Sequence, residues 1–509
     1  MLKKNNILKS NVGQLAVLSV CFIAGMFLFS MSTSPLTANM LGLDSSIFSL
    51  LGKGIASGKT LYVDLFDHKG PLIFFVNALG HMLGGRTGIF FIQCLNGLVC
   101  LFLLYNTVRI LKPEEDYLSL KDLLFIFVPS YTYFFYTFER GNLTEEYSLL
   151  FICISLFLFC KYAANEKDTS AHNPVYAAVY GVSFAALALF RLNNAVTVCA
   201  GIFVIFCNLI YKKQFKNLFL NLAAGTAGMA VVIVPTLLYF NSKSALNDMI
   251  YATFLHNFQI AANTGHESVL SKPQIFLILY APIGVSAFLW IANALKEKKL
   301  SFFDCLAGTI LILNLASLWI ANRFPHYFAV FVPVYSVCIA KYLPTVSFKK
   351  LSTFVLVCSF ALSAVGLGYY DYYKNFNSYF ITKETTARSE AIKKALEIIP
   401  ENEKDSVIGY QIRTDVYHYA DIIPCYKYYT LQETWAITNP QITDDFFAWI
   451  ETEKPLWVIK DTESSNEIFE NILEEHYEEK IRNEYIVIYK LKTKYNECFV
   501  NTHTINKKP

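Results

Sequence analysis

Eleven apolar stretches, each long enough to cross a lipid bilayer as a helix, restrict the fold of this chain more than any other feature. Hydrophobic residues make up 54% of the 509 residues and charged residues only 16%, which is too apolar for a soluble globule. The sequence therefore predicts an α-helical polytopic membrane protein. The stretches lie near residues 14–33, 88–110, 120–138, 147–163, 174–190, 193–211, 218–240, 273–295, 302–321, 325–342 and 351–369.

Lysine and arginine gather in alternate connections between these stretches, and such clusters mark the cytoplasmic side of a membrane. This pattern predicts a cytoplasmic amino terminus and an integral, multi-pass protein of a bacterial cell membrane. It requires that the apolar segment Pro71–Gly85 does not cross, and we expect a helix there that lies at the membrane surface or is partly inserted. The clusters are Lys3/Lys4/Lys9, Arg109/Lys112/Lys121, Lys161/Lys167, Lys212/Lys213/Lys216, Lys296/Lys298/Lys299 and Lys341/Lys349/Lys350.

The unusual polar residues of the membrane part gather in the connections that face outward. The apolar stretches themselves carry almost no ionisable group, because a charge at that depth is costly. We therefore expect function at the outer surface of the membrane rather than along a path through it. The outward connections are 34–87, 139–146, 191–194, 241–272 and 322–326.

The segment Asp44–Pro71 follows the first apolar stretch and concentrates charge in an otherwise apolar region. Its apolar residues Ile47, Leu50, Leu51 and Ile55 have the spacing of a helix with one apolar face, too short to span. We expect a helix lying on the membrane surface. Asp44 at its start is either a functional carboxylate or the residue that caps the helix.

The composition changes after residue 370, where charge rises and membrane-length stretches stop. The pattern predicts two domains, a membrane domain over 1–370 and a small α/β domain over 371–509. An odd number of spans places the second domain outside the cytoplasm. The predicted helices are 384–399, 444–453 and 467–481, and the predicted strands are 406–410, 456–460 and 485–491.

Several chemistries lack their motifs. The sequence contains no Walker-type phosphate loop, HExxH, paired CxxC or GxSxG motif. The net charge of +3 gives a nucleic-acid partner no electrostatic support. What remains is a set of outward-facing carboxylates and bases.

Three outward segments resemble those of the GT-C fold membrane glycosyltransferases, which include the protein O-mannosyltransferases and the lipid A aminoarabinose transferase. The first combines Asp44, then Gly58 with Tyr62 and Asp64, then the run Asp67–Pro71 (DHKGP). The second is 141–151 (GNLTEEYSLLF) and the third 322–328 (NRFPHYF). The likeness covers roughly the first 370 residues, and we expect the terminal domain to add little to it.

The resemblance implies roles for individual residues. Transfer of a sugar from a lipid phosphate needs a base for the acceptor proton, cations for the leaving phosphate and hydrogen bonds to the sugar. The implied catalytic residues are Asp44 and the pair Glu145 and Glu146; the phosphate ligands are Lys69, His68, Arg191, Arg323 and His326; the substrate-binding residues are Asp64, Asp67, Asn142 and Tyr62.

Plainer interpretations stay open for these residues. Lys69 and His68 also fit residues that contact lipid headgroups at the membrane surface. Arg191 and Arg323 also fit residues that form ion pairs with Glu139 or Glu145. Asp64 and Asp67 either orient Lys69, bind the acceptor or hold a divalent cation, or are solvated loop residues; no other cofactor is implied. His256 and His266 have no motif around them, and we expect both at the surface.

The sequence thus favours a membrane glycosyltransferase that uses a polyprenyl-phosphate-linked sugar and acts on a polysaccharide, glycolipid or protein of the cell envelope. A transporter or flippase of lipid-linked saccharides is the alternative, although transporters usually carry polar or broken helices near the midplane. A non-catalytic assembly partner is a third reading, but it would have no need for Asp44 and Lys69.

Overall fold

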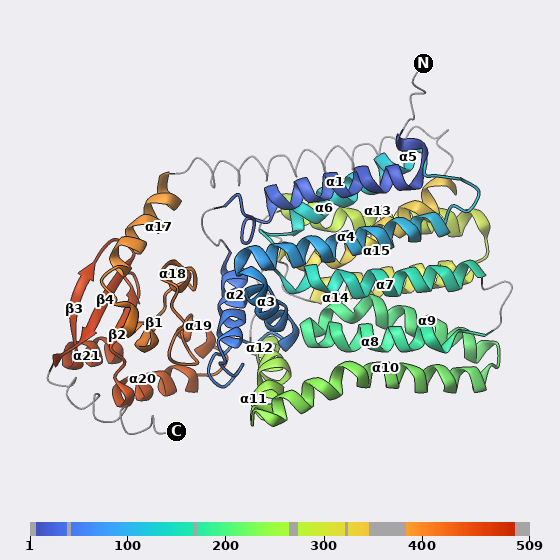
Figure 1. The fold of residues 1–509 in the computed structure, drawn as a ribbon. Helices are drawn as coiled ribbons and strands as arrows, with labels where there is room; N and C mark the ends of the chain where they lie inside the picture. Colours follow the sequence, from blue (N-terminus) through green and yellow to red (C-terminus); the bar gives the residue numbers. More distant parts are fainter. Residues whose placement is uncertain are drawn as a thin grey trace, which may run out of the picture.

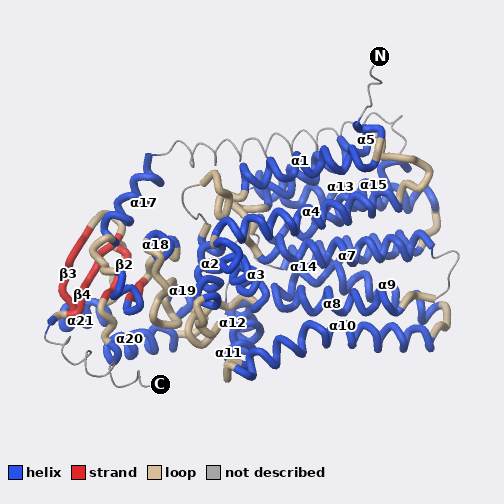
Figure 2. Tube along the Cα trace, viewed as in Figure 1, coloured by secondary structure: helices blue, strands red, loops and turns tan. Residues whose placement is uncertain are grey.

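The computed structural model describes residues 7–37, 42–165, 171–263, 273–320, 324–345 and 383–493. Long helices lie side by side as a bundle, and a small unit of sheet and helices packs against one end of it (Figure 1). Short helices lie between the bundle and this α/β unit. The tube in Figure 2 shows that the strands in the described ranges all belong to the α/β unit. The predicted mostly helical chain with a small C-terminal sheet is confirmed.

The bundle begins with η1 (Ile7–Lys9) and ends, in the described ranges, at residue 345. Its long helices are α1 (Asn11–Phe29), α4 (Arg86–Ile110), α7 (Thr144–Asn165), α8 (Pro174–Arg191), α9 (Val196–Tyr211), α10 (Phe215–Ser242), α13 (Pro273–Glu297) and α14 (Phe302–Ile320). Its shorter pieces are α5 (Leu120–Asp122), η2 (Leu123–Phe127), α6 (Val128–Thr137), η3 (Leu192–Ala195), η6 (Pro325–Phe331), α15 (Val332–Tyr342) and η7 (Leu343–Thr345).

Seven helical runs in the described ranges are long and apolar enough to cross a membrane. One of them, Pro174–Tyr211, contains both α8 and α9, joined by the short turn η3. Two further predicted spans are built from consecutive shorter pieces: α5, η2 and α6 cover 120–137, and η6 with α15 covers 325–342. The last predicted span, 351–369, lies outside the described residues, so the count of eleven stays a prediction.

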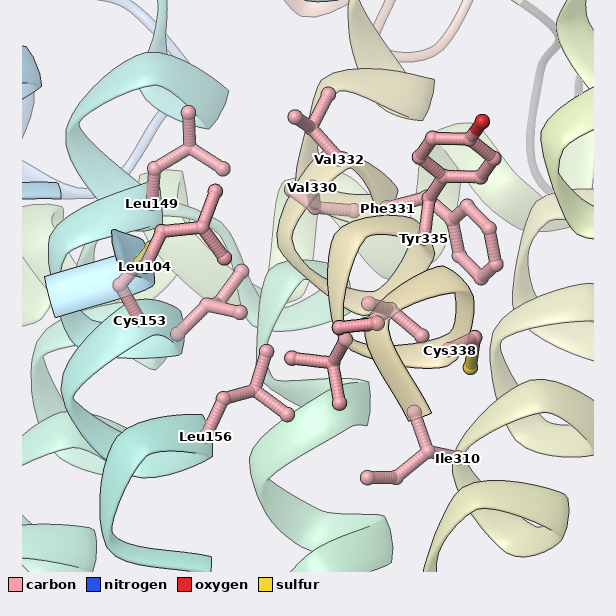
Figure 3. Packing of buried hydrophobic residues seen from close by; sticks show 14 of the residues in the cluster. Leu104, Leu149, Cys153, Leu156, Ile310, Val330, Phe331, Val332, Tyr335 and Cys338 are labelled. Carbon is pink, nitrogen blue, oxygen red and sulfur yellow. The ribbon is translucent and has the colours of Figure 1, made fainter. Parts of the chain in front are cut away.

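Buried apolar side chains hold the bundle together. Figure 3 shows side chains of α4, α7 and α14 packed against η6 and α15. Two cysteines contribute to this cluster as small apolar residues, as is usual for buried cysteine. The labelled members are Leu104, Leu149, Cys153, Leu156, Ile310, Val330, Phe331, Val332, Tyr335 and Cys338.

The first outward connection folds into α2 (Leu43–Ala56) and α3 (Pro71–Gly84), which lie across the end of the bundle (Figure 1). α2 forms where a helix is expected, but its burial is not confined to one apolar face, and its position relative to a membrane stays a prediction. Every residue from Ser45 to Gly52 is buried, because α3 packs on one side and the α/β unit on the other. The helices α11 (Leu246–Ile250), η4 (Tyr251–Leu255) and α12 (His256–Asn263) lie beside them.

The α/β unit has a four-stranded sheet of order β1-β2-β4-β3. β1 pairs with β2 in parallel, and the other two pairs are antiparallel. The strands are β1 (Val407–Tyr410), β2 (Trp457–Asp461), β3 (Tyr477–Arg482) and β4 (Ile486–Leu491). The helices are α17 (Lys383–Leu396), η8 (Glu401–Ser406), α18 (Asp415–Tyr419), α19 (Gln432–Ala436), α20 (Gln441–Glu453) and α21 (Glu467–His476).

One predicted element of this unit is wrong. The helix predicted over 467–481 ends at His476, and the chain continues as β3. The Glu- and Lys-rich sequence favours helix, but pairing with β4 overrides that local preference. β3 is an edge strand with mostly exposed side chains, so it lacks the apolar alternation that marks a strand in sequence.

Candidate active site

A cavity of about 1340 Å³ lies where the bundle end meets the α/β unit. Its wall comes from the start of α2, the residues before α3, the turn between α6 and α7, the end of α8, the η4–α12 region and η6, with α19 on the side of the α/β unit. Most of its lining is apolar. The acidic and basic side chains in it are Asp44, His68, Lys69, Glu139, Arg140, Arg191 and His326.

Asp44 lies in the first turn of α2 and lines the cavity. The helix is capped by Gly42, whose φ of 109° suits glycine, so the alternative that Asp44 is the cap is wrong. A carboxylate in the first turn is stabilised by the helix dipole. Within the described ranges it accepts no hydrogen bond, so its oxygens stay available to a bound molecule. Beside it, the Ser45 hydroxyl is buried without a partner in those ranges.

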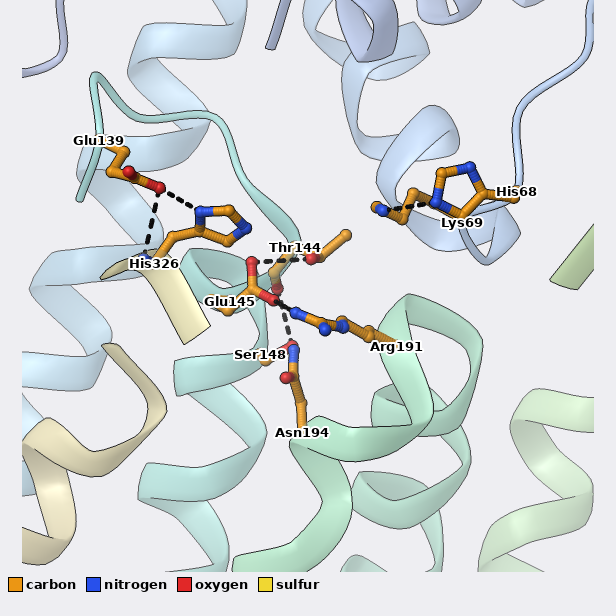
Figure 4. Close-up of polar contacts among 9 residues, drawn as sticks. All are labelled: His68, Lys69, Glu139, Thr144, Glu145, Ser148, Arg191, Asn194 and His326. Atoms are coloured by element: carbon orange, nitrogen blue, oxygen red, sulfur yellow. Dashed lines mark hydrogen bonds and ion pairs between the residues drawn. The ribbon is translucent and has the colours of Figure 1, made fainter. Parts of the chain in front are cut away.

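Lys69 and His68 also line the cavity and contact each other (Figure 4). Lys69 Nζ lies 2.9 Å from His68 Nε2. Burial and the positive charges of Lys69 and Arg191 lower the pKa of His68, so its imidazole is neutral and accepts from the ammonium. The backbone here is also fixed, since Asn257 Nδ2 donates to His68 O at 2.6 Å.

Three residues predicted to bind substrate, two of them also considered for orienting Lys69, build the loop that carries Lys69. The Tyr62 hydroxyl donates to Lys69 O at 2.7 Å, and Asp67 Oδ1 accepts from Lys69 N at 2.8 Å. Asp64 Oδ2 accepts from Thr60 N at 2.6 Å. Burial raises the pKa of Asp67 to about 6, although the Lys69 charge opposes the shift. None of the three lines the cavity.

A divalent cation finds no ligand cluster in the part of the chain that the structure describes. No group of three or more His, Cys, Asp or Glu side chains there is placed to hold a metal ion. Asp64 and Asp67, the two carboxylates considered for that role, are both taken up by backbone amides.

Arg191 reaches the cavity from the end of α8 (Figure 4). Its Nη1 donates to Glu145 Oε1 at 2.6 Å, and Thr144 donates to the other carboxylate oxygen at 2.9 Å. The guanidinium carbon lies 3.3 Å from the centre of the Tyr327 ring. Glu145, at the start of α7, is only 1% exposed and does not line the cavity. The structure therefore puts Arg191 in front and Glu145 behind it.

The turn between α6 and α7 has an unusual backbone. Four consecutive residues have positive φ: Glu139 (41°), Arg140 (81°), Gly141 (82°) and Asn142 (62°). Such angles are unfavourable for residues other than glycine and persist only where surrounding contacts impose them. The turn directs Glu139 and Arg140 to the cavity, where Glu139 pairs with His326 Nδ1.

Asn142 and Glu146 supply those contacts. The side chain of Asn142 exchanges hydrogen bonds with Asn77, at 2.9 and 3.2 Å, and accepts from the Tyr147 hydroxyl at 3.0 Å. Glu146 Oε2 accepts from Asn142 N at 2.9 Å and from Gln93 at 2.8 Å. Both residues are buried and neither lines the cavity, so the structure does not bring them to a substrate.

The predicted set is thus divided. Asp44, His68, Lys69, Arg191 and His326 meet at one cavity, whereas the other described members lie behind its wall. Arg323 lies outside the described residues, as does His266.

Sequence reasoning missed two contributions. His256, expected at the surface, is fully buried beside His68. The α/β unit also reaches the cavity, through Leu431, Thr434, Trp435, Ile437 and Thr438. No motif marks these residues. Phe66 joins the two parts: its N donates to Lys427 O at 3.0 Å, and its ring lies 5.5 Å from that of Trp435.

Comparisons with known proteins identify both a family and a fold. Residues 3–352 match the model of the family described as "Putative competence-induced protein Ccs4 N-terminal domain". No curated protein matches the sequence. A crystal structure of ArnT from Cupriavidus metallidurans bound to undecaprenyl phosphate has a TM-score of 0.64 at 13% identity, over 93% of this chain and 97% of that chain. The same protein in the apo state has a TM-score of 0.58 at 13% identity, over 94% and 98%.

The predicted resemblance to the GT-C aminoarabinose transferases is therefore confirmed at the level of the fold, and with it an integral membrane protein. One expectation about its extent is wrong. Since the alignment covers 93% of the chain, the likeness continues beyond residue 370 into the α/β unit.

Proposed function

The chain belongs to the family of the competence-induced protein Ccs4 N-terminal domain, and we propose that it is a membrane glycosyltransferase. It takes a sugar from a polyprenyl-phosphate-linked donor and transfers it to a polysaccharide, glycolipid or protein of the cell envelope. The reaction takes place on the outer face of a bacterial cell membrane. Nucleic acid has no part in it.

One observation carries this proposal. A single cavity at the end of the bundle holds an unpaired carboxylate, Asp44, among the described residues, together with the cations Lys69 and Arg191. A base and two phosphate-binding cations are what transfer from a lipid phosphate requires. The ArnT crystal structure, whose fold this chain shares, holds undecaprenyl phosphate. We extend that ligand class to the present cavity.

In the proposed reaction, Asp44 removes the proton from the acceptor hydroxyl. The hydroxyl oxygen forms a bond to the anomeric carbon of the sugar while the bond from that carbon to the phosphate oxygen breaks. The negative charge that grows on the departing lipid phosphate is stabilised by Lys69 and Arg191. Both cations are held ready, Lys69 by His68 and Arg191 by Glu145 and Tyr327.

The remaining residues take supporting roles in this proposal. His326 and Glu139, paired on another part of the wall, bind hydroxyl groups of the sugar or acceptor. Glu145 acts through Arg191, and Glu146 with Asn142 holds the turn that presents Glu139. Tyr62, Asp64 and Asp67 shape the loop of Lys69.

The topology belongs to the same proposal. The amino terminus is cytoplasmic, eleven spans follow, and the domain over 371–509 lies outside the cytoplasm. There it covers the outer side of the cavity and helps to bind the acceptor. This arrangement puts Asp44, Lys69 and Arg191 on the outer side.

Mass spectrometry of lipid-linked sugars and envelope glycans tests the function in cells with the wild-type protein, without it, and with Asp44→Asn. We expect loss of one glycan modification and accumulation of one polyprenyl-phosphate sugar in both altered strains. Asp248→Asn, an exposed carboxylate in α11 outside the cavity wall, is the control and should match wild type. Unchanged glycans and lipid-linked sugars without the protein would refute the proposal. Loss of the modification without the protein, but not in Asp44→Asn, would show that Asp44 is not the base.

A further inference from the structure

His256 is an unusual buried residue next to the candidate site. It is 0% exposed, and neither of its ring nitrogens has a hydrogen-bond partner within the described ranges. It begins α12, directly after the π-helical turn η4. Its ring is surrounded by other rings, with centre-to-centre distances of 5.6 Å to Phe66, 5.8 Å to Tyr251 and 5.9 Å to His68.

The neighbouring imidazole of His68 has a defined tautomer. The Lys69 ammonium has only protons to offer, so His68 Nε2 must accept. The proton of the neutral His68 ring therefore sits on Nδ1, which is buried and likewise without a partner in those ranges. A donor on His68 thus lies near a ring that offers an acceptor nitrogen.

Burying unpaired polar atoms destabilises a fold, and a phenylalanine would fill the same space without that cost. A residue that leaves buried polar atoms without hydrogen bonds, and brings no evident structural gain, is expected at a functional site. The cations near the pair are Lys69 and Arg191, and both disfavour a charged His68. Burial lowers the pKa of His256 as well, so both rings stay neutral and His256 keeps an acceptor nitrogen.

We propose that His256 is a positioning residue for Lys69. It accepts a hydrogen bond from Nδ1–H of His68 through one water molecule, and so fixes the ring whose Nε2 holds the Lys69 ammonium at the cavity wall. His256 does not touch the substrate; it acts through His68 and Lys69. This inference rests on the proposed function, because it takes Lys69 as a ligand of the lipid phosphate.

The other contacts of α12 make the role of His256 separable. Asn257 Nδ2 donates to His68 O at 2.6 Å and to Thr253 O at 2.9 Å. The hydroxyl of Tyr251 accepts from Asn439 at 2.8 Å, away from the histidine pair. The bond from Asn257 to His68 O holds α12 against the Lys69 loop without His256. Replacing the His256 imidazole therefore removes the two ring nitrogens and leaves the local backbone supported.

The test measures binding of undecaprenyl phosphate to the purified full-length protein in nanodiscs, for wild type, His256→Phe, Lys69→Met and the double variant. His256→Phe should weaken binding by about 3- to 10-fold, the value of one hydrogen bond, while its unfolding temperature stays the same or rises. In the Lys69→Met background the same change should have no further effect, because the two residues act in series. His256→Gln, which supplies an amide oxygen as acceptor, should recover part of the affinity.

Tyr251→Phe is the matched control, since it removes a polar atom from the same ring cluster and should bind normally. Suppose that Lys69→Met by itself weakens binding, as the proposed function requires. Unchanged affinity in His256→Phe would then overturn the inference alone. The same holds if His256→Phe weakens binding equally in the wild-type and Lys69→Met backgrounds. A wild-type protein that does not bind undecaprenyl phosphate at all would overturn the proposed function and the inference together.

Discussion

The Glu145 carboxylate accepts a hydrogen bond from Arg191 at 2.6 Å and thereby ties the start of α7 to the end of α8. The carboxylate is buried, whereas the guanidinium reaches the cavity. A buried ion pair of this kind depends on both partners, because either one alone leaves an uncompensated charge.

We therefore expect Arg191→Ala to destabilise the protein by about 3–5 kcal/mol, since it strands the Glu145 charge. The double variant Arg191→Ala with Glu145→Ala should unfold at a higher temperature than Arg191→Ala alone, although neither should bind undecaprenyl phosphate well. Thermal unfolding and ligand binding of wild type, Arg191→Ala, Glu145→Ala and the double variant check this. An additive loss of stability in the double variant would contradict the pairing.

Asp44→Asn should lower sugar transfer by about 10²–10⁴-fold, since it removes the base. Donor binding and stability should change little, because Asp44 is not the helix cap and accepts no hydrogen bond in the described ranges.

Lys69→Ala should chiefly weaken donor binding and cost about 3–4 kcal/mol of transition-state stabilisation. Binding and transfer measured separately for both variants distinguish the roles. An active Asp44→Asn protein would move the base to another carboxylate.

The sequence predicts much of this site because its residues stand in short runs. Asp44 and Lys69 lie in one outward connection, and their motif-like spacing is readable without a structure. Charge patterning also gives the prediction that α3 does not cross the membrane, and α3 does lie across the bundle end. A short sequence pattern is enough to predict functional residues that lie close together in the sequence.

Other features depend on contacts between distant segments. The sequence suggests that Asp67 binds substrate, yet its carboxylate accepts a hydrogen bond from the backbone amide of Lys69, two residues away. The burial of His256 requires Phe66 and Tyr251 to close around it. Trp435 reaches the cavity only because the α/β unit packs against α2. Hydrophobic periodicity predicts helices and strands, but it does not predict packing between segments that are far apart in the sequence.

The proposed topology predicts which turns are accessible from each side. In a variant without native cysteines, a single cysteine at Lys213 (α9–α10) or Lys298 (α13–α14) should react only from the cytoplasm, and one at Asn439 only from outside. Labelling of position 439 from the cytoplasm alone would reverse the map and place the cavity on the inner side.

Gly141→Ala should disturb the left-handed turn that presents Glu139 and Arg140. A Cβ there would lie 2.6 Å from the Phe138 ring and 2.8 Å from Ser30 Oγ, at a φ of 82°. We expect a clear loss of both stability and transfer, because the turn must shift. Gly284→Ala is the control: Gly284 lies inside α13, and among the described residues no atom apart from its own neighbouring helix backbone lies within 4 Å of the added Cβ. It should be neutral or slightly stabilising, and equal effects of the two changes would contradict the role of the turn.

Asp67→Asn should stabilise the protein at neutral pH. Burial raises the pKa of Asp67 to about 6 from 3.8, so the folded state holds its proton more tightly than the unfolded state. Stability is then lost as the pH rises from about 4 through 6, by up to about 3 kcal/mol for a shift of this size. Asparagine keeps the Oδ1 acceptor for Lys69 N and cannot ionise. Unfolding temperatures of the two proteins should therefore agree near pH 4 and diverge by pH 7.5, with the variant higher. Asp64→Asn, whose carboxylate binds a backbone amide in the same loop, is the matched control and should show no such gain. A wild-type protein that is as stable as Asp67→Asn at pH 7.5 would show that the Asp67 carboxylate ionises in the fold without cost.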